Sequence, residues 1–198
     1  APGAATGLAL LAFLGNGNTP YSGTYKQNVC DAVKFLISNQ ILVSEGTPGG
    51  SGSCVPWEIP PGRLSAGGGE LYSHLIAHWS LAEAVLLSQE AIDGDCAEEC
   101  DLTMEEMRTA AESATAYTVY AHLDGGSWKY TPIWGDGDRK GDPSHMIWGL
   151  SALLASKKAG LQGALSDTQL HKIKNLLQQI SLNSVDDPSA GYDIASIY

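Results

Sequence analysis

Three strongly apolar segments recur along this chain and can be superposed on one another without gaps. They are residues 6–14, 71–89 and 142–158. In this superposition Ala12, Ser80 and Ser151 coincide, and the successive offsets are 68 and 71 residues. Near-equal offsets are typical of a helical repeat in which each unit buries its apolar face against the next. The sequence therefore predicts an array of repeated helical units.

An amphipathic helix is predicted after each apolar one. The helix expected at 25–40 has Val29, Val33 and Leu36 on one stripe. Two capping boxes, Thr103-x-x-Glu106 and Ser166-x-x-Gln169, mark the starts of the other two, and Asp142-Pro143 marks the start of the third apolar helix. We expect one all-α domain over residues 1–198. Its helix pairs lie at about 5–40, 71–122 and 142–182.

Length and composition fit a single domain with a real core. The chain has 198 residues, of which 43% are hydrophobic, and its formal net charge is −11. A charge of this sign repels phosphate backbones and excludes a nucleic-acid partner. No apolar run approaches the ~20 residues that span a bilayer. Residues 46–69 are so rich in Gly, Pro and Ser that we predict a long connection without a regular element.

The four cysteines are an even set without a CxxC pair, which favours disulfides over a redox motif. We expect Cys96 to pair with Cys100 and Cys30 with Cys54; free thiols, or a metal site that borrows a histidine, are the alternatives. Disulfides persist in oxidising compartments, so we expect a secreted, periplasmic or cell-surface protein. The chain opens Ala1-Pro2-Gly3 without Met, which we interpret as a processed product.

Four stretches carry a resemblance to a known family. They are TGLALLAFLGNGNTPYSGTYKQNVCDAVKFLISNQ (6–40), LYSHLIAHWSLAEAVLL (71–87), DGGSWKY (124–130) and GDPSHMIWGLSALLASKKAGL (141–161). Together they resemble bacterial prenyltransferase and squalene-oxidase repeat proteins. The resemblance implies an α/α toroid, in which inner helices line a barrel and outer helices surround it. Three pairs would form a partial toroid, so we expect a homo-oligomer or the rest of a longer chain to complete the core.

The family's reactive motifs are not found in the chain. The Asp-x-Asp-Asp acid motif of squalene-hopene cyclases has no match, and the nearest stretch is residues 136–142. The Gln-and-Trp repeat is reduced to residues 124–128, and the zinc-ligand pattern of protein prenyltransferases is missing. The resemblance therefore implies a fold and no particular reaction.

Three histidines are candidate metal ligands or proton-transfer groups. His74 and His78 are four residues apart on one helix face, and the repeat places His145 at the position of His74. Imidazoles that converge at one rim of the array could hold zinc or form a catalytic pair. The alternative is that Ser-His is a repeat signature whose imidazoles cap or bridge backbone groups there.

Three aspartates are candidates for oxygen-ligand or acid chemistry. Asp136, Asp138 and Asp142 could bind calcium, and Asp142 could supply a cyclase-like acid. The alternative for Asp142 is a helix N-cap before Pro143.

Five tryptophans could line an apolar or sugar-binding cavity, or pack in the core. They are Trp57, Trp79, Trp128, Trp134 and Trp148.

The leading functional prediction is a non-catalytic secreted or periplasmic toroid-repeat module for assembly or binding. The missing acid and zinc motifs favour a protein that is not an enzyme. A terpenoid-cyclase-like or prenyl-binding enzyme with an apolar ligand, in which Asp142, His74 and His145 face a cavity, is the second hypothesis. A metal-binding site at the histidine rim is the third.

Overall fold

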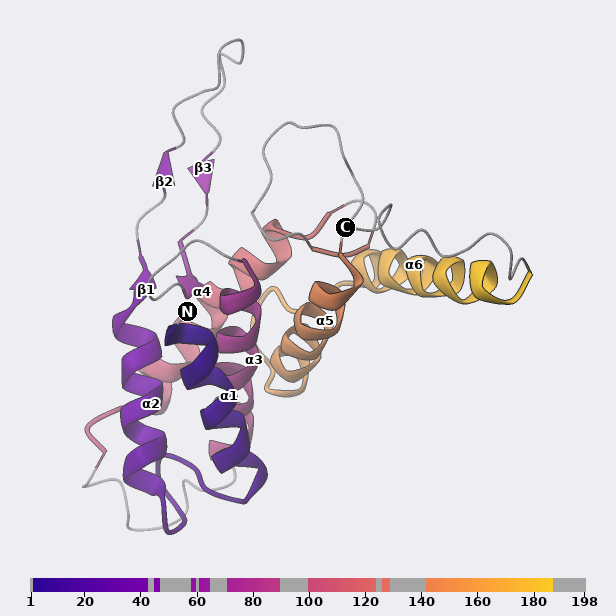
Figure 1. Cartoon of the computed structure of the whole chain (residues 1–198). Coiled ribbons are helices and arrows are strands. Elements are labelled where there is room, and N and C mark those ends of the chain that lie inside the picture. Colours follow the sequence, from indigo (N-terminus) through magenta and orange to yellow (C-terminus); the bar gives the residue numbers. More distant parts are fainter. Residues whose placement is uncertain are drawn as a thin grey trace.

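The computed structural model describes residues 2–42, 45–46, 58–59, 61–64, 71–89, 100–123, 126–128 and 142–186. Within these ranges, six helices pack together in a mostly helical fold (Figure 1). The helices are α1 (Pro2–Gly15), α2 (Lys26–Ser38), α3 (Leu71–Ser88), α4 (Met104–Tyr120), α5 (Pro143–Lys158) and α6 (Asp167–Asp186). No helix among the described residues is long and apolar enough to cross a membrane.

The predicted helices and their caps are confirmed. Thr103 and Glu106 form the capping box of α4, in which each side chain accepts a hydrogen bond from the other residue's backbone N–H. Ser166 and Gln169 make the same reciprocal pair before α6. At the far end of α5, Gly160 adopts a φ of +66° beyond the last helical residue. The ends of these three helices can be predicted from local sequence, because a capping residue satisfies backbone N–H or C=O groups within one turn of itself.

The three helices of the repeat superposition lie next to one another. Helix α3 packs extensively against both α1 and α5. Helix α2 contacts α1 and α3, whereas α4 contacts α3 and α5. Each of these two amphipathic helices therefore packs across the junction between two of the apolar ones.

Short strands lie in and beside the connection predicted to lack regular elements, so that prediction was wrong in part. β1 (Gln40–Ile41) pairs antiparallel with β4 (Arg63–Leu64), and β2 (Glu45–Gly46) pairs with β3 (Glu58–Ile59). Tertiary contacts hold the first pair. The Gln40 amide donates to Ala110 O of α4 at 2.8 Å, and Leu64 is buried in the core. Such contacts leave no periodic signal in a two-residue strand.

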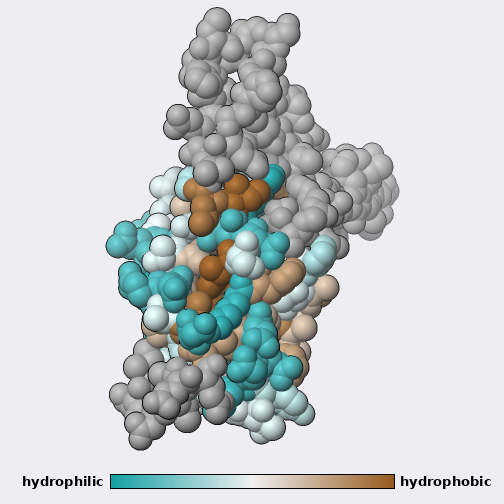
Figure 2. Space-filling model, turned by 90° about the vertical axis from the view of Figure 1, so that its left-hand side faces the viewer, coloured by the Kyte–Doolittle hydropathy of each residue, from teal (hydrophilic) through white to brown (hydrophobic). Residues whose placement is uncertain are grey.

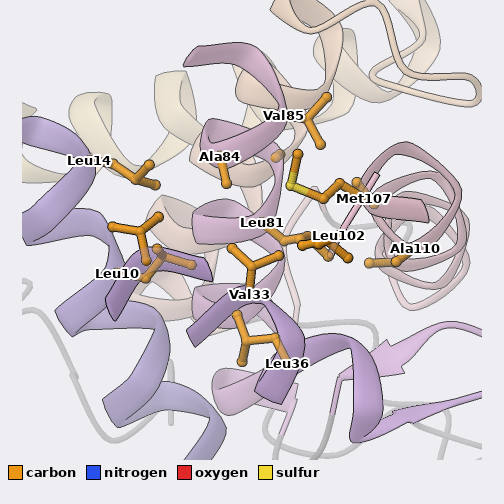
Figure 3. Packing of buried hydrophobic residues seen from close by; sticks show 14 of the residues in the cluster. Leu10, Leu14, Val33, Leu36, Leu81, Ala84, Val85, Leu102, Met107 and Ala110 are labelled. Carbon is orange, nitrogen blue, oxygen red and sulfur yellow. The ribbon is translucent and has the colours of Figure 1, made fainter. Parts of the chain in front are cut away.

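The buried residues form two clusters. The first core is mostly aliphatic and lies between α1, α2, α3 and α4 (Figure 3), and the end of α5 adds Ala155 and Ala159 to it. It includes Leu10, Leu14, Val33, Leu36, Leu81, Val85, Leu102 and Met107. The second core gathers around Trp128 and joins α5 and α6 to the beginning of α3 and the end of α4. It consists of Leu71, Leu75, Tyr117, Ala121, Trp128, Met146, Leu153, Leu165 and Ile173.

A disulfide joins Cys30 of α2 to Cys100, just before α4. The predicted pairings of Cys30 with Cys54 and of Cys96 with Cys100 were therefore wrong, and Cys54 and Cys96 lie outside the described residues. Packing of α4 near α2 brings together two cysteines that are 70 residues apart in the sequence. The same segment is also held by the Tyr21 hydroxyl, which donates to Leu102 O at 2.7 Å.

The surface on the α2 side is largely hydrophilic, with hydrophobic side chains at intervals (Figure 2). Helix α2 buries Val29, Val33 and Leu36 and turns Gln27 and Asp31 to solvent, where they hydrogen bond at 2.8 Å. This is the amphipathic pattern that the sequence predicts. Helix α1 differs, because its exposed residues are also apolar.

Candidate functional site

Two of the candidate histidines lie inside the helix array. His74 and His78 sit one turn apart on α3, and their side chains face Thr115 and Thr118 of α4. Ser156 of α5 reaches the same group from the other side. All five side chains are fully buried. Together they form a polar chain that links three helices through their interior.

Hydrogen-bond geometry fixes where each proton of this chain lies. The backbone N–H of Leu64 donates to His74 Nδ1 at 2.9 Å, so a neutral His74 carries its proton on Nε2. That proton is directed at Thr118 Oγ1, 2.8 Å away. The Thr118 hydroxyl then donates to His78 Nδ1 at 2.7 Å, which places the His78 proton on Nε2.

The chain ends at two hydroxyls that have other acceptors for their own protons. His78 Nε2 lies 3.0 Å from both Thr115 Oγ1 and Ser156 Oγ. The hydroxyl of Thr115 donates to Ala111 O at 2.8 Å, and that of Ser156 donates to Ala152 O at 2.9 Å. Every donor in this arrangement has an acceptor. A buried polar network that is fully satisfied in this way holds its helices in one register.

Burial keeps both imidazoles neutral. Desolvation lowers the pKa of His78 from 6.5 to about 3. The pKa of His74 is also well below its usual value, first because of burial and then because His78 and Arg63 disfavour a positive charge on this ring. Neutral imidazoles are what the hydrogen-bond directions require. The geometry and the electrostatics therefore agree.

The third histidine lies elsewhere. The His145 ring is buried, with Nδ1 3.5 Å from Asp142 Oδ2 and 3.4 Å from Ser144 Oγ, and it meets the Tyr72 ring edge to face. Within the described ranges, no group of three or more His, Cys, Asp or Glu side chains is placed to hold a metal ion. Asp136 and Asp138 lie outside those ranges. His74 does bridge a backbone group, the Leu64 N–H, as the alternative interpretation predicted.

Asp142 is the N-cap of α5. Its carboxylate accepts from Ser144 N at 2.8 Å, its own N–H donates to Trp128 O at 2.7 Å, and its carbonyl accepts from the Ser127 hydroxyl. The capping interpretation is confirmed. These bonds attach the start of α5 to the segment that carries Trp128.

The described tryptophans divide between core and surface. Trp128 is fully buried and donates from Nε1 to Thr118 O at 2.9 Å, as the core interpretation predicted. Trp79 and Trp148 are only partly buried, and their ring centroids lie 5.7 Å apart across α3 and α5. Trp148 Nε1 donates to the Tyr72 hydroxyl at 2.8 Å. Trp57 and Trp134 lie outside the described residues.

The threonine and serine partners of the histidines were not predicted as site residues. Thr115 and Thr118 carried one available signal, because both fall among the alanines that α4 buries. A hydroxyl on an apolar stripe needs a hydrogen-bond partner. Ser156 gave a similar signal on α5.

Searches of protein-family models, of curated proteins and of solved structures find no match to this chain. The resemblance to prenyltransferase and squalene-oxidase repeat proteins therefore stays a hypothesis that rests on the sequence motifs.

Proposed function

We propose that this chain is a non-catalytic helical-repeat module that acts by assembly or binding outside the cytoplasm. In this proposal its helices are part of an α/α toroid-type array, as the family resemblance implies. Helices α1, α3 and α5 would be the inner set, and α2, α4 and α6 the outer set.

The observation that carries the proposal is the exposed apolar surface of α1. The helix has no charged residue, yet Ala5, Leu8, Ala9 and Ala12 are exposed along one side of it. A helix that is apolar on every side is normally buried. Its exposed side is therefore a surface for a protein or apolar partner.

The state of the histidines also favours a structural role. Both nitrogens of His74 and of His78 are engaged in hydrogen bonds, and neither side chain is accessible. A general base needs a lone pair within reach of substrate. The two imidazoles instead join α3 to α4 and α5.

The disulfide supports a location outside the cytoplasm, and the net charge limits the kinds of partner. A disulfide such as Cys30–Cys100 persists in oxidising compartments. A net charge of −11 disfavours binding to nucleic acid or to anionic lipid surfaces.

Sedimentation across a wide concentration range, together with turnover assays on linear isoprenoids and prenyl diphosphates, tests the proposal. We expect self-association or partner binding and no product. Turnover that is lost in Asp142→Asn would overturn the non-catalytic role.

A second candidate, a terpenoid-cyclase-like or prenyl-binding enzyme, is favoured by one observation. Tyr72, Trp79 and Trp148 form a partly exposed aromatic cluster, and buried His145 lies against Tyr72. Titration of tryptophan fluorescence with a linear isoprenoid tests it. Saturable quenching that is lost in Trp79→Ala would support this candidate.

A further inference from the structure

Hydrogen bonds attach the β1–β4 pair to α4 and to α3. The Gln40 side-chain amide of β1 donates to Ala110 O of α4 at 2.8 Å and to Gly62 O at 3.2 Å. The Leu64 N–H of β4 donates to His74 Nδ1 of α3 at 2.9 Å. The Gln40 attachment is made by amide groups, which do not titrate, whereas the Leu64 attachment depends on the protonation of an imidazole. Acid should therefore act on the attachment to α3 and spare the one to α4.

The Leu64 N–H uses the lone pair that a neutral His74 offers. This lone pair lies on Nδ1, because the proton on Nε2 is directed at Thr118 Oγ1, 2.8 Å away. A proton added to His74 therefore goes to Nδ1, where two N–H donors then face each other. The Leu64 N–H cannot rotate, and a buried amide that loses its acceptor is costly. A protonated ring and a bound β4 exclude each other.

His78, one turn away in the same polar chain, would respond differently to a proton. Its lone pair on Nδ1 accepts from the Thr118 hydroxyl at 2.7 Å, and its Nε2 lies 3.0 Å from the hydroxyls of Thr115 on α4 and Ser156 on α5. A hydroxyl can turn its proton to another acceptor, whereas a backbone N–H is fixed by its strand. Of the two histidines, His74 is therefore the one whose protonation acts on the backbone of β4.

The surroundings of His74 disfavour a charge on its ring while β4 is bound. The ring is fully buried, and burial is the largest cause that holds its pKa well below the ordinary value of 6.5. His78 of α3 and Arg63 of β4 lower the pKa further, and the Ala114 carbonyl of α4 raises it without offsetting them. The Tyr117 ring of α4 meets the imidazole edge to face at 4.7 Å, and α1, which also packs on α3, has no charged residue. Departure of β4 removes Arg63 and admits water, so it removes two of these causes.

We propose that His74 is a pH-sensitive latch: a proton on its Nδ1 releases β4 from α3, while Gln40 keeps β1 on α4 and the six helices stay packed. Release exposes the Leu64 side chain, which is 2% exposed when β4 is bound. The helices have their own packing in the two cores and the covalent link between Cys30 and Cys100. The latch works within one chain, so it stands independently of the proposed assembly role.

Proton linkage gives the direction and the size of the response. In the released state the His74 ring meets water and regains its ordinary pKa of 6.5, whereas its pKa is well below this value when β4 is bound. The released state therefore binds more protons below about pH 7, and acid favours it. Between pH 7.5 and 5, the ratio of released to bound molecules should rise about 30-fold.

Hydrogen exchange of single backbone amides tests the latch in the native chain. The Leu64 N–H reports release of β4, and the N–H of Leu81, which lies on α3 in the first core, reports unfolding of the helices. We expect the protection of Leu64, relative to its intrinsic exchange rate, to fall about 30-fold from pH 7.5 to 5. It should stay below the protection of Leu81 at both pH values. Low concentrations of urea should leave it unchanged, because a local opening exposes little surface.

His74→Asn separates the titration from the hydrogen bond. The Asn Oδ1 lies near the position of Nδ1 and accepts the Leu64 N–H without titrating. The pH response of Leu64 should disappear, and because this response is a ratio between two pH values, it is independent of any stability lost with the bond to Thr118. His78→Asn is the matched control. It keeps an acceptor for the Thr118 hydroxyl and should retain the response of about 30-fold at Leu64.

The native chain alone can refute the latch. Equal protection of Leu64 at pH 7.5 and 5 would do so, because His74 would then not be linked to β4. Exchange of Leu64 and Leu81 at one common opening rate at every pH would mean that β4 leaves only when the helices unfold, which also overturns the proposal. A response that persists in His74→Asn would assign it to another group.

Discussion

The two cores of this molecule are stabilised by different means. The first core, formed mainly by α1 to α4, is mostly aliphatic and has a covalent link between Cys30 and Cys100. The second core, around Trp128, is smaller and is held by aromatic contacts and by hydrogen bonds to buried side chains. The histidine chain of α3 lies where the two meet. Neighbouring regions of one helical fold can therefore be stabilised by different chemistry.

The difference predicts that the two regions respond to different perturbations. Aliphatic packing has little directionality and depends on filled volume, whereas a hydrogen-bonded core depends on geometry and protonation. The first core should be sensitive to loss of its covalent link. The second should be sensitive to small displacements of Trp128, and the histidine chain between the two cores should make their junction sensitive to pH.

Removal of the disulfide is expected to have the largest effect. Replacing Cys30 and Cys100 by alanine frees a loop of 70 residues, for which chain entropy predicts a loss of about 4 kcal/mol. Urea unfolding at pH 7.5 measures the change. A loss below ~1 kcal/mol would mean that packing alone holds α4 against α2.

Acid is expected to destabilise the junction of the two cores. The unfolded chain protonates His78 near pH 6.5, whereas the folded chain does so only near pH 3, so the unfolded state binds more protons between these values. Stability is therefore complete above about pH 7 and falls as the pH drops. Between pH 7.5 and 5, His78 alone should remove about 2 kcal/mol.

Unfolding free energies measured over this range check the prediction. Burial lowers the pKa of His74 as well, so it adds to the slope in the same direction. His78→Leu should reduce the slope by up to one proton. His171→Gln is the control, because this residue is exposed on α6 in the folded chain. An unchanged slope in His78→Leu would refute the neutral buried imidazole.

Glycine substitutions compare the packing of the two cores directly. A Cβ at Gly149 would lie 2.6 Å from the Trp128 ring, which is buried and held by its bond to Thr118 O. At Gly7 the nearest atoms are 3.1 Å away. We expect Gly149→Ala to cost about 2 to 3 kcal/mol and Gly7→Ala about 1 kcal/mol.

Gly15→Ala is the matched control for both glycine variants. A Cβ there meets nothing within 4 Å, so the change should be neutral or stabilising by up to ~1 kcal/mol. Thermal unfolding ranks the three variants. Equal effects at Gly7 and Gly149 would argue against a more rigid second core.

Helix capping is expected to give the smallest difference. Asp142→Ala removes the carboxylate that accepts from Ser144 N and should cost about 1 kcal/mol. Thr103→Ala removes the corresponding cap of α4, on an exposed surface, and should cost a similar amount or less. An Asp142 variant as stable as the native chain would exclude the capping role.

The local features of the fold could be predicted from sequence. Apolar periodicity located the helices, and the cap residues Thr103, Asp142 and Ser166 marked three helix starts within a residue. These features depend on neighbours within one turn. The strand pairs between α2 and α3 were missed, because Gln40 and Leu64 are held there by contacts with distant helices.

The candidate site was predicted only in part. The spacing of His74 and His78 placed them on one face, which is confirmed by their stacked rings. Their partners could not be predicted, because Thr118 and Ser156 come from helices 40 or more residues away and meet them only after packing. The disulfide pairing was wrong for the same reason. Proximity in sequence favoured Cys54 and Cys96, whereas the crossing of α2 and α4 joins Cys30 to Cys100.

The Cys30–Cys100 bond also changes what a break in the chain would mean. Residues 30–100 form a covalent ring, which includes the connection before α3 and α3 itself. A protease that cuts one peptide bond within this ring opens it without dividing the molecule. The ends of the chain on either side stay attached through sulfur, and two fragments appear only after reduction.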